Sequence, residues 1–474
     1  MTASDNRHVT IAVVGGGLAG LSAACALADA GFRVTLLERR HYLGGRASSY
    51  EHPGTGEVVD NCQHVLLGCC TNLIDFYHRT GVADRIRWFD RLTFLEPGGR
   101  ASFLEPAPLP APLHNVPAFL RFGALGLGAK LAIARAMLLL LEVMPQDSSQ
   151  NFLGWLKDHG QTPQAIERFW KVVLVSALNE DLDRISVYYA AQVFRESFLK
   201  SAAAGRMGVP TVPLTELYSA GLVYLGVRGS TVRLRCAVEA VHADPAQVRL
   251  AVAGEELAAD YAILAVPFDV LGRIVPADES AQRLREQIAP LETSPITGIH
   301  LWFDREITEL DHAVLLDRTI QWMFHKSRLL GTHRNGSVGH PNGERGSYVE
   351  LVVSSSKSLV QKSRQEIVDL AMSELYEFLP AARQAQLVKA TVIKEIHATF
   401  SAQPLVDSFR PSFTTAWPRI FLAGDWTATG WPATMEGAVR SGYRAAEEVA
   451  RHAGRPVRLL APDLPPAGFM RLFS

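Results

Sequence analysis

The chain has 474 residues, of which 48% are hydrophobic, enough for a large core in two or three folding units. A near balance of 47 basic and 48 acidic residues gives a net charge of -1 and argues against a bulk nucleic-acid-binding protein. Five cysteines cannot build a disulfide framework in so long a chain, and the start "MTASDNRH" lacks the basic and apolar regions of a secretory signal, so we predict a cytoplasmic protein.

The first predicted unit is a strand, a glycine-rich turn, a helix and a second strand. Residues 9–14 form a short apolar run, helical spacing follows as far as Gly31, and "RVTLLE" is typical of a strand. Between the strands lie Gly15, Gly17 and Gly20. The first allows a tight turn, the second lets the backbone approach a pyrophosphate, and the third lets helix and strand pack closely. This spacing between two strands predicts a dinucleotide-binding turn.

Further candidate contacts of a dinucleotide flank this turn. Leu18 and Ala19 lie at the start of the predicted helix, where free backbone N–H groups face the phosphates. Glu38 ends the second strand, where a carboxylate suits a ribose hydroxyl, and Arg39 follows it. The next block, "LGGRASSY", adds Gly44, Gly45 and Arg46 as candidates for the flavin side of the pyrophosphate.

The stretch "VVDNCQHVLLGCC", residues 58–70, raises the question of a metal site. It holds Cys62, His64, Cys69 and Cys70, which together could supply three thiolates and one imidazole. Cys62 and Cys69 are separated by an apolar run, Cys69 and Cys70 are adjacent, and no second cysteine pair lies elsewhere in the sequence. We therefore predict no metal, and buried free thiols instead. His64 remains a candidate functional polar group.

A proline-rich stretch at residues 105–117 is typical of a linker or domain edge, and an apolar stretch follows it. Arg121, Lys130, Arg135 and Glu142 interrupt residues 116–143, which speaks against a simple membrane-spanning helix. Two interpretations stay open for this region. It forms a buried helix pair, or residues 112–144 dip into one leaflet of a membrane beside a lipid entry port.

The rest of the chain alternates between helical and strand-like regions. Residues 150–204 are predicted to be helical, and the regions 231–266, 287–305 and 347–354 are predicted to hold strands. An amphipathic helix follows and ends at Pro380.

The C-terminal block "FLAGDWTATGWPATMEGAVRSG" predicts a strand, a loop and a long helix. Gly424 and Asp425 follow the strand, and the Asp425 carboxylate is placed to accept hydrogen bonds from ribityl or phosphate-side hydroxyls. A helix that starts near Thr434 and Met435 would direct its positive end at the flavin.

These three blocks, in this order and spacing, resemble the flavin amine oxidase and phytoene desaturase superfamily. The resemblance implies an α/β fold with a Rossmann-like FAD-binding domain (GR2/amine-oxidase type), an inserted α+β substrate domain, and FAD as cofactor. It also implies an adenine contact at Val238. We assign residues 1–100, 205–285 and 396–456 to the discontinuous FAD-binding domain, and residues 101–204 and 286–395 to the substrate domain.

The middle of the chain indicates a narrower family. "DNCQHVLLGCC" and "IERFWKVVLVSALNEDLDRIS" resemble the hydroxysqualene dehydroxylases, FAD-dependent enzymes of squalene and hopanoid formation. This resemblance implies reductive removal of a hydroxyl from an apolar isoprenoid. If residues 112–144 dip into one leaflet, we expect peripheral contact at the inner face of the cell membrane. A carotenoid-type desaturase, a flavin amine oxidase and a non-catalytic lipid-binding escort of the same fold remain alternatives.

Such a reaction requires an apolar pocket, a proton donor and exclusion of water. His64 is the first candidate donor, because the pKa of histidine lies near neutral; a purely structural histidine is the alternative. Glu436 is a second candidate, and its alternative role is to cap its helix. Aromatic faces could stabilise an allylic cation, and the candidates are Trp170, Phe303, Trp322 and Trp431. For each of them a role in the hydrophobic core is the alternative, and burial statistics favour it. The sequence holds no second glycine-rich phosphate motif, so we expect an external electron donor.

Overall fold

The computed structural model describes residues 9–52, 56–142, 144–331 and 346–472. Residues 1–8 of the first predicted domain range and residue 143 of the predicted membrane-contact segment lie outside the described residues.

A parallel sheet forms the core of the dinucleotide-binding half. In the part of the chain that the structure describes, its five strands run in the order β10 (Thr231–Arg233), β2 (Arg33–Leu37), β1 (Thr10–Val14), β14 (Tyr261–Leu264) and β20 (Ile420–Leu422). Every neighbouring pair is parallel. The sheet combines segments from both ends and the middle of the chain, and this confirms the predicted Rossmann-like α/β fold.

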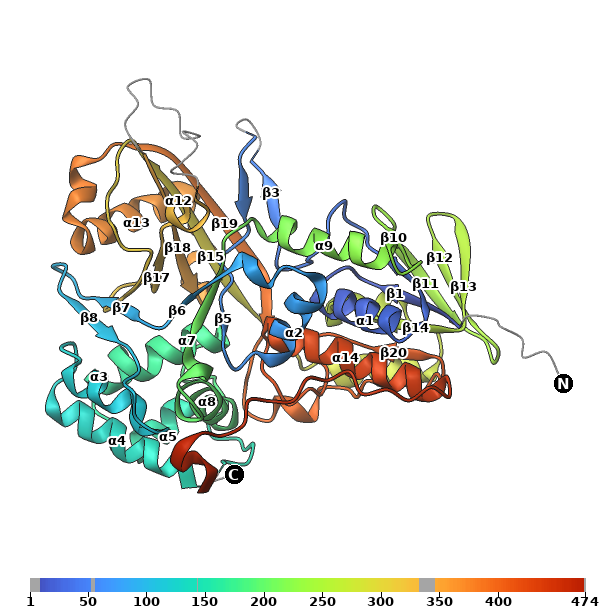
Figure 1. Cartoon of the computed structure of the whole chain (residues 1–474), viewed down its shortest axis with the longest axis horizontal. Helices are drawn as coiled ribbons and strands as arrows, with labels where there is room; N and C mark the ends of the chain where they lie inside the picture. Colours follow the sequence, from blue (N-terminus) through green and yellow to red (C-terminus); the bar gives the residue numbers. More distant parts are fainter. Residues whose placement is uncertain (1–8, 53–55, 143, 332–345, 473–474) are drawn as a thin grey trace.

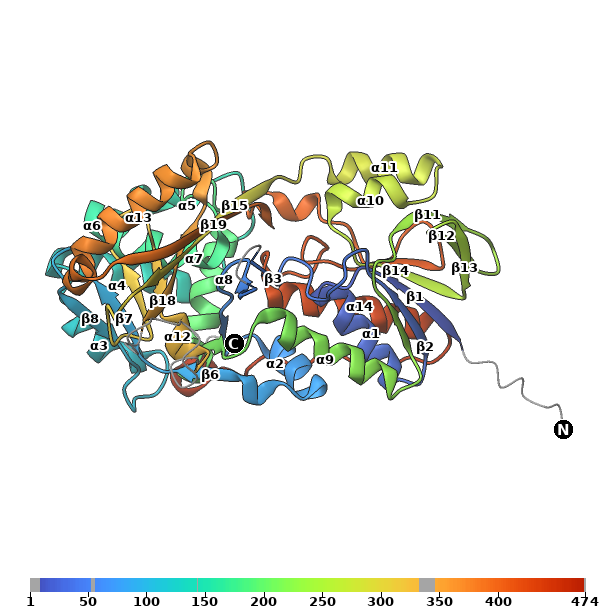
Figure 2. The same ribbon diagram turned by 90° about the horizontal axis from the view of Figure 1, so that it is seen from above.

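Both faces of this sheet are covered, as a parallel sheet requires. Ile11 and Val13 of β1 belong to a hydrophobic cluster with α1 (Leu18–Asp29) and α14 (Met435–His452), to which α9 (Leu214–Gly226) and α2 (Thr71–Thr80) also contribute. Ala12 and Val14 point to the other face, in a cluster with the antiparallel strands β11 (Val238–Ala243), β12 (Val248–Val252) and β13 (Glu255–Ala259). Figure 2 shows α10 (Phe268–Ile274) and α11 (Glu279–Ile288) on the opposite side from α9.

A larger, mostly antiparallel sheet lies at the other end of the elongated molecule (Figure 1). Its seven strands, among the described residues, run in the order β19 (Leu387–Phe400), β15 (Thr293–Phe303), β18 (Ser347–Ser354), β17 (Trp322–Phe324), β16 (His312–Leu315), β7 (Leu92–Leu95) and β8 (Ala101–Leu104). The strand β7 pairs in parallel with β16. The larger sheet therefore begins before residue 100, where the sequence placed the first domain boundary.

The two faces of the larger sheet differ. Ile299, Leu301 and Phe303 of β15 pack in a hydrophobic cluster with α13 (Arg364–Phe378). The alternate residues of β15 face inward, toward the dinucleotide-binding half. Below the sheet in Figure 1 lies a helical layer of α3 (Val116–Arg121), α4 (Leu127–Glu142), α5 (Phe152–Asp158), α7 (Lys171–Leu178) and α8 (Val187–Val193). The short helix α6 (Pro163–Ala165) follows α5 in the chain and packs against α4.

Short elements connect the two halves. They are the hairpin of β3 (Ser49–Glu51) and β4 (Val58–Asp60), the strands β5 (Leu66–Leu67), β9 (Met207–Pro210) and β6 (Ile86–Phe89), and the helix α12 (Lys326–Leu329). The C-terminal segment returns to the helical layer, where the amide of Phe469 donates to the carbonyl of Ala111 at 2.8 Å.

Helix α4 is buried on one face only. Ala129, Ile133, Ala136 and Leu140 pack into the core, whereas Leu127, Leu131 and Leu138 are 71%, 59% and 60% exposed. The interpretation as a buried helix pair therefore explains only the buried face of α4 and not its exposed leucines. No helix in the described ranges is both long enough and apolar enough to cross a membrane.

Helices α1 and α14 pack so closely that one added methyl group at their contact should destabilise the protein. A Cβ on Gly442 of α14 would lie 2.2 Å from Ser22 Oγ and 2.3 Å from the carbonyl oxygen of Ala19. We expect Gly442→Ala to lower the free energy of unfolding by about 1–3 kcal/mol through overpacking, measured by urea denaturation. Gly226→Ala is the control, because no described atom lies within 4 Å of its added Cβ. An equal loss of stability in both variants would contradict the prediction.

Candidate active site

A cavity of about 420 Å³ lies where the two halves meet, within the range of small-molecule sites. It brings together fourteen of the predicted cofactor contacts and His64. These are Gly15, Gly17, Leu18, Ala19, Glu38, Arg39, Gly44, Gly45, Arg46, Val238, Gly424, Asp425, Thr434 and Met435. Gly20 and Glu436, also predicted, do not line it.

Two glycine turns touch each other at one end of the cavity. The amide of Gly44 donates to the carbonyl of Gly16 at 2.9 Å, and a Cβ on Gly45 would lie 2.9 Å from the Cα of Gly17. Gly15 has a φ of 108°, and a Cβ there would lie 2.4 Å from the carbonyl oxygen of Ala265. Gly20 packs against Gly15, where an added Cβ would lie 1.9 Å from the carbonyl oxygen. The absence of side chains thus leaves a backbone cradle at the start of α1.

Glu38 fixes the edge of this cradle. Its Oε2 accepts the amide of Gly16 at 2.7 Å, and its Oε1 accepts the amide of Arg40 at 2.7 Å. Each carboxylate oxygen keeps a lone pair for a further donor. Val238, at the start of β11, lines the same end of the cavity, next to Cys236, whose amide donates to the carbonyl of Glu38 at 2.8 Å.

Arg46 and Asp425 form an ion pair across the cavity wall. The second amino group of Arg46 donates to the carbonyl oxygen of Ala398 at 3.1 Å, and Asp425 is 4% exposed. The sequence predicted both side chains as separate cofactor contacts, and the structure places them together. A charged pair of this kind offers both a guanidinium donor and a carboxylate acceptor to a polar ligand.

The start of α14 contributes the next part of the wall. Thr434 caps this helix, with its Oγ1 accepting the amide of Gly437 at 3.0 Å. Met435 follows, and its sulfur lies 3.5 Å from the hydroxyl of Tyr218, a residue of α9. The positive end of the helix therefore faces the cavity.

The larger sheet supplies an apolar wall on the other side. Ile296 of β15, Trp322 and Phe324 of β17, and Val352 of β18 line the cavity. The rings of Trp322 and Phe324 are stacked, with centroids 5.4 Å apart. Of the predicted aromatic candidates only Trp322 lies in this wall, because Trp170 and Phe303 are core residues and Trp431 stacks on Arg440.

His64 lies in the segment that follows β4 and lines the cavity. Its Nδ1 is 2.8 Å from the carbonyl oxygen of Cys62. A carbonyl only accepts hydrogen bonds, so Nδ1 carries the proton and Nε2 holds a lone pair. Burial lowers the pKa of His64 below its ordinary value of 6.5. The imidazole is therefore neutral at pH 7 and becomes a proton donor only in more acidic solution.

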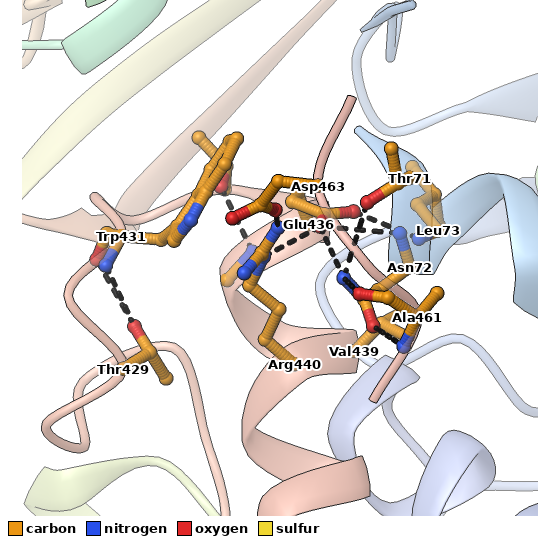
Figure 3. A network of polar contacts seen from close by, with 12 residues as sticks. Thr71, Asn72, Leu73, Thr429, Trp431, Glu436, Val439, Arg440, Ala461 and Asp463 are labelled. Atoms are coloured by element: carbon orange, nitrogen blue, oxygen red, sulfur yellow. Dashed lines mark hydrogen bonds and ion pairs between the residues drawn. The ribbon is translucent and has the colours of Figure 1, made fainter. Parts of the chain in front are cut away.

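Glu436 has partners of its own, outside the cavity lining (Figure 3). Its carboxylate accepts the backbone amides of Asn72 at 3.2 Å and Leu73 at 2.8 Å, and pairs with Arg440 at 2.6 Å. Arg440 also pairs with Asp463 near the C-terminus. Helical geometry turns position 436 away from the cavity-lining residues Thr434, Met435 and Ala438. The carboxylate instead joins α14 to the start of α2.

The cysteines are free thiols, and all five lie in the described ranges. Cys69 and Ser197 are 3.5 Å apart through their side-chain Sγ and Oγ atoms. No group of three or more His, Cys, Asp or Glu side chains among the described residues is arranged to hold a metal ion.

Several cavity residues were not singled out as site residues from the sequence. Asn61 donates to the Arg46 carbonyl at 2.7 Å and to Glu395 at 3.1 Å. Asn179, at the end of α7 with a φ of 52°, donates to the carbonyl of Ser294 and accepts the amide of Ser355. The left-handed conformation of Asn179, which is uncommon outside glycine, distinguishes it in the structure but cannot be seen in the sequence.

Comparison with known proteins agrees with this geometry. The family model described as "Flavin containing amine oxidoreductase" matches residues 18–450. Among curated proteins, the chain is 28% identical to 15-cis-phytoene desaturase of Synechococcus elongatus, over 94% of this chain and 98% of that protein. It is 25% identical to a protein named "Probable zeta-carotene desaturase" from the same organism, over 92% and 98% of the two chains.

Solved structures share the fold at low identity. An oxidoreductase from Methanosarcina mazei matches with a TM-score of 0.70 and 14% identity, over 91% of this chain and 98% of that chain. Cyclohexylamine oxidase from Brevibacterium oxydans matches with a TM-score of 0.67 and 16% identity, over 95% and 100%. The glycine cradle, the free start of α1 and the Arg46–Asp425 pair fit FAD, which is the cofactor.

The contact between the two glycine turns can be tested through cofactor affinity. We expect Gly45→Ala to weaken FAD binding by tenfold or more, because its methyl group would collide with Gly17 in the cradle. FAD titration of apoprotein by fluorescence quenching measures this. Gly81→Ala is the matched control, since Gly81 also has a positive φ but no described atom within 4 Å of its added Cβ. Unchanged FAD affinity in Gly45→Ala would contradict the prediction.

Proposed function

Because the chain belongs to the family of flavin-containing amine oxidoreductases, we propose that it is an FAD-dependent enzyme that removes the hydroxyl group of hydroxysqualene to form squalene. The observation that carries this proposal is the cavity itself, in which an apolar wall from the larger sheet lies opposite the glycine cradle and His64. A long hydrocarbon chain is the kind of substrate that such a wall accommodates.

Two further observations support an isoprenoid substrate. The relatives at 28% and 25% identity are named for carotenoids, which are long isoprenoids. The segments around Cys62 and around Trp170 resemble the hydroxysqualene dehydroxylases, which favours the reductive reaction over the others in the family.

In this reaction the residues of the chain bind FAD, orient the substrate and protonate its leaving group. The glycine cradle and the Arg46–Asp425 pair hold FAD, which supplies a hydride when reduced. The wall around Trp322 and Phe324 excludes water and offers aromatic faces to an allylic cation. His64 gives its proton to the departing hydroxyl, which leaves as water. The electron pair comes from an external donor.

A second candidate function is isoprenoid desaturation by oxidised FAD. The neutral imidazole of His64 favours it, because a lone pair on Nε2 suits a base that takes a proton from carbon. The names of the carotenoid desaturases favour it as well. The two reactions make opposite demands on His64, which must be protonated for dehydroxylation and neutral for desaturation.

Anaerobic incubation with hydroxysqualene after photoreduction tests the proposal, with squalene as the assayed product. We expect kcat/KM to rise as the pH falls through the lowered pKa of His64, because only the protonated ring donates. His64→Gln should flatten this profile and lower kcat by about tenfold to a thousandfold.

Three outcomes would contradict the dehydroxylase. They are phytoene consumption by the oxidised protein with a rate that rises with pH, hydrogen peroxide formation with an amine, and a protein that takes up no FAD. Rapid flavin reduction by NADPH alone would contradict the external donor.

We further propose that α3 and α4 lie on the cytoplasmic face of a membrane. Leu127, Leu131 and Leu138 are exposed on one face of α4, and Leu120 of α3 is also exposed. Isolated apolar side chains are ordinary on a protein surface, but a row of leucines is typical of an interaction surface. Arg121 and Arg135 lie exposed in the same region and suit anionic headgroups.

Co-sedimentation with vesicles of phosphatidylcholine and phosphatidylglycerol measures this contact. We expect the double variant Leu131→Glu and Leu138→Glu to bind at least about tenfold more weakly, since each buried leucine contributes about 1.5–3 kcal/mol. The control is Val223→Glu on α9, which is 70% exposed on another part of the surface. Equal binding by the wild type and the leucine variant would refute the membrane face.

A further inference from the structure

A second group of ionisable side chains lies directly behind the apolar wall of the cavity. Ile296 of β15 and Val352 of β18 line the cavity. Farther along the same strands and on the same face lie His300 and Glu350, which are paired across the two strands. Lys326 of α12 completes the group. His300 and Glu350 are fully buried, and Lys326 is 1% exposed.

Lys326 makes two close contacts and one longer one. Its Nζ lies 2.8 Å from Asp60 Oδ2, 2.8 Å from Gln63 Oε1 and 3.6 Å from Glu350 Oε2. The carboxylate of Asp60 is fully used, because its Oδ1 also accepts the Ser49 hydroxyl at 2.7 Å and the Leu214 amide at 3.0 Å. Lys326 and Asp60 therefore form a satisfied, neutral pair.

Glu350 is different. Neither of its carboxylate oxygens accepts a hydrogen bond of normal length and angle from any residue that the structure describes, and Nε2 of His300 also lacks a partner there. The nearest donors, Nζ of Lys326 at 3.6 Å and the backbone amide of Gln63, only partly offset the burial of Glu350. The other nitrogen of His300 is 2.7 Å from the hydroxyl of Tyr348. A fully buried carboxylate whose donors are this weak is costly when ionised, and native proteins rarely keep such a group without a reason.

The charges around Glu350 show which group changes state. The charged groups are Lys326 of α12 and Asp60 of β4, and the other titratable groups, all neutral near pH 7, are His300 of β15, Tyr348 of β18, Tyr50 of β3 and Cys62 in the cavity lining. Burial raises the pKa of Glu350 to about 7 and lowers that of His300 to about 3. Although burial opposes it, Asp60 raises the pKa of Lys326. At neutral pH, therefore, Glu350 is the member of the group that exchanges a proton.

The group is connected to the cavity through the segment that forms its floor. Gln63 lines the cavity, and its Oε1 accepts a hydrogen bond from Nζ of Lys326. Its side-chain NH2 group donates to the backbone carbonyl of His64 at 3.0 Å. A Cβ on Gly298 would lie 3.2 Å from the Asn61 carbonyl oxygen and 3.5 Å from Nε2 of His300. The missing side chain at Gly298 leaves the group in close contact with the floor.

We propose that Glu350 is a proton acceptor coupled to the charge of the cavity. It takes up one proton from solvent when negative charge enters the cavity and releases it when that charge leaves. The proposal rests on the proposed function in one respect, because flavin reduction brings the charge. The external donor supplies the electron pair, solvent supplies the proton, and Lys326 and Asp60 keep their charges throughout. Glu350 does not line the cavity, so it acts on the reaction only through its charge, whereas His64 lines the cavity and can contact the substrate.

The first measurement uses apoprotein and is independent of flavin chemistry. We expect infrared titration of carboxyl groups to show one buried carboxyl that loses its proton near pH 7, and Glu350→Gln to abolish this signal. Lys326→Met should move the titration to higher pH, because the nearby cation no longer favours the ionised form. A wild-type spectrum without a carboxyl that titrates near neutral pH would overturn the proposal.

The second measurement follows proton uptake during photoreduction of FAD-loaded protein in weakly buffered solution, with an indicator dye. Above pH 7 the wild type should take up as much as one more proton per flavin than Glu350→Gln. Glu374→Gln is the matched control, because Glu374 is a buried carboxylate whose oxygens accept the amides of Thr319 and Ile320. The control should take up as many protons as the wild type.

The outcomes separate this proposal from the proposed function. If the protein binds FAD but Glu350→Gln takes up as many protons as the wild type, the role of Glu350 is refuted whatever the substrate is. If the difference in uptake is present but hydroxysqualene does not react, the role of Glu350 stands and the proposed substrate fails.

Discussion

The buried ion pair of Asp60 and Lys326 joins the two halves of the molecule directly beneath the cavity. Asp60 ends β4 in the connecting hairpin and also accepts the first amide of α9 in the dinucleotide-binding half, whereas Lys326 begins α12 beside the larger sheet. Removal of one partner from a buried pair leaves an uncompensated charge, which destabilises a protein by about 3–5 kcal/mol. The residues after Asp60 form the cavity floor, so the positions of Asn61, Gln63 and His64 depend on this pair.

The dinucleotide-binding side could be predicted because its signals are local. Gly15, Gly17 and Gly20 lie between two strands, and the turn geometry that requires them is set within a few residues. The same holds for Gly44, Gly45 and the cap at Thr434. What the sequence could not give was their mutual contact, since the close approach of Gly45 to Gly17 and the pairing of Arg46 with Asp425 depend on how distant segments fold together.

The substrate side was largely hidden for the same reason. Its apolar wall combines Ile296, Trp322 and Val352 from three strands, and in the sequence each belongs to an ordinary hydrophobic run. Glu350 lies within such a run, and nothing in the neighbouring sequence shows that its carboxyl group is buried. Helix α4 posed the opposite problem, because its leucines are the same on the buried and exposed faces and only packing distinguishes them.

His64 and Glu436 show how burial decides between roles that a sequence leaves open. Both are ionisable residues beside predicted flavin contacts, but Glu436 receives backbone amides and an arginine, while His64 keeps a lone pair in the cavity. Burial raises the pKa of Glu436, and its several donors hold the carboxyl group in a fixed place outside the cavity lining. A neutral imidazole changes its proton with modest changes in its surroundings. A cavity that excludes water and contains an apolar substrate cannot obtain compensating charge from solvent, so charge that moves within it must be balanced by groups of the protein. That requirement connects His64 at the floor with the buried carboxyl of Glu350 behind it.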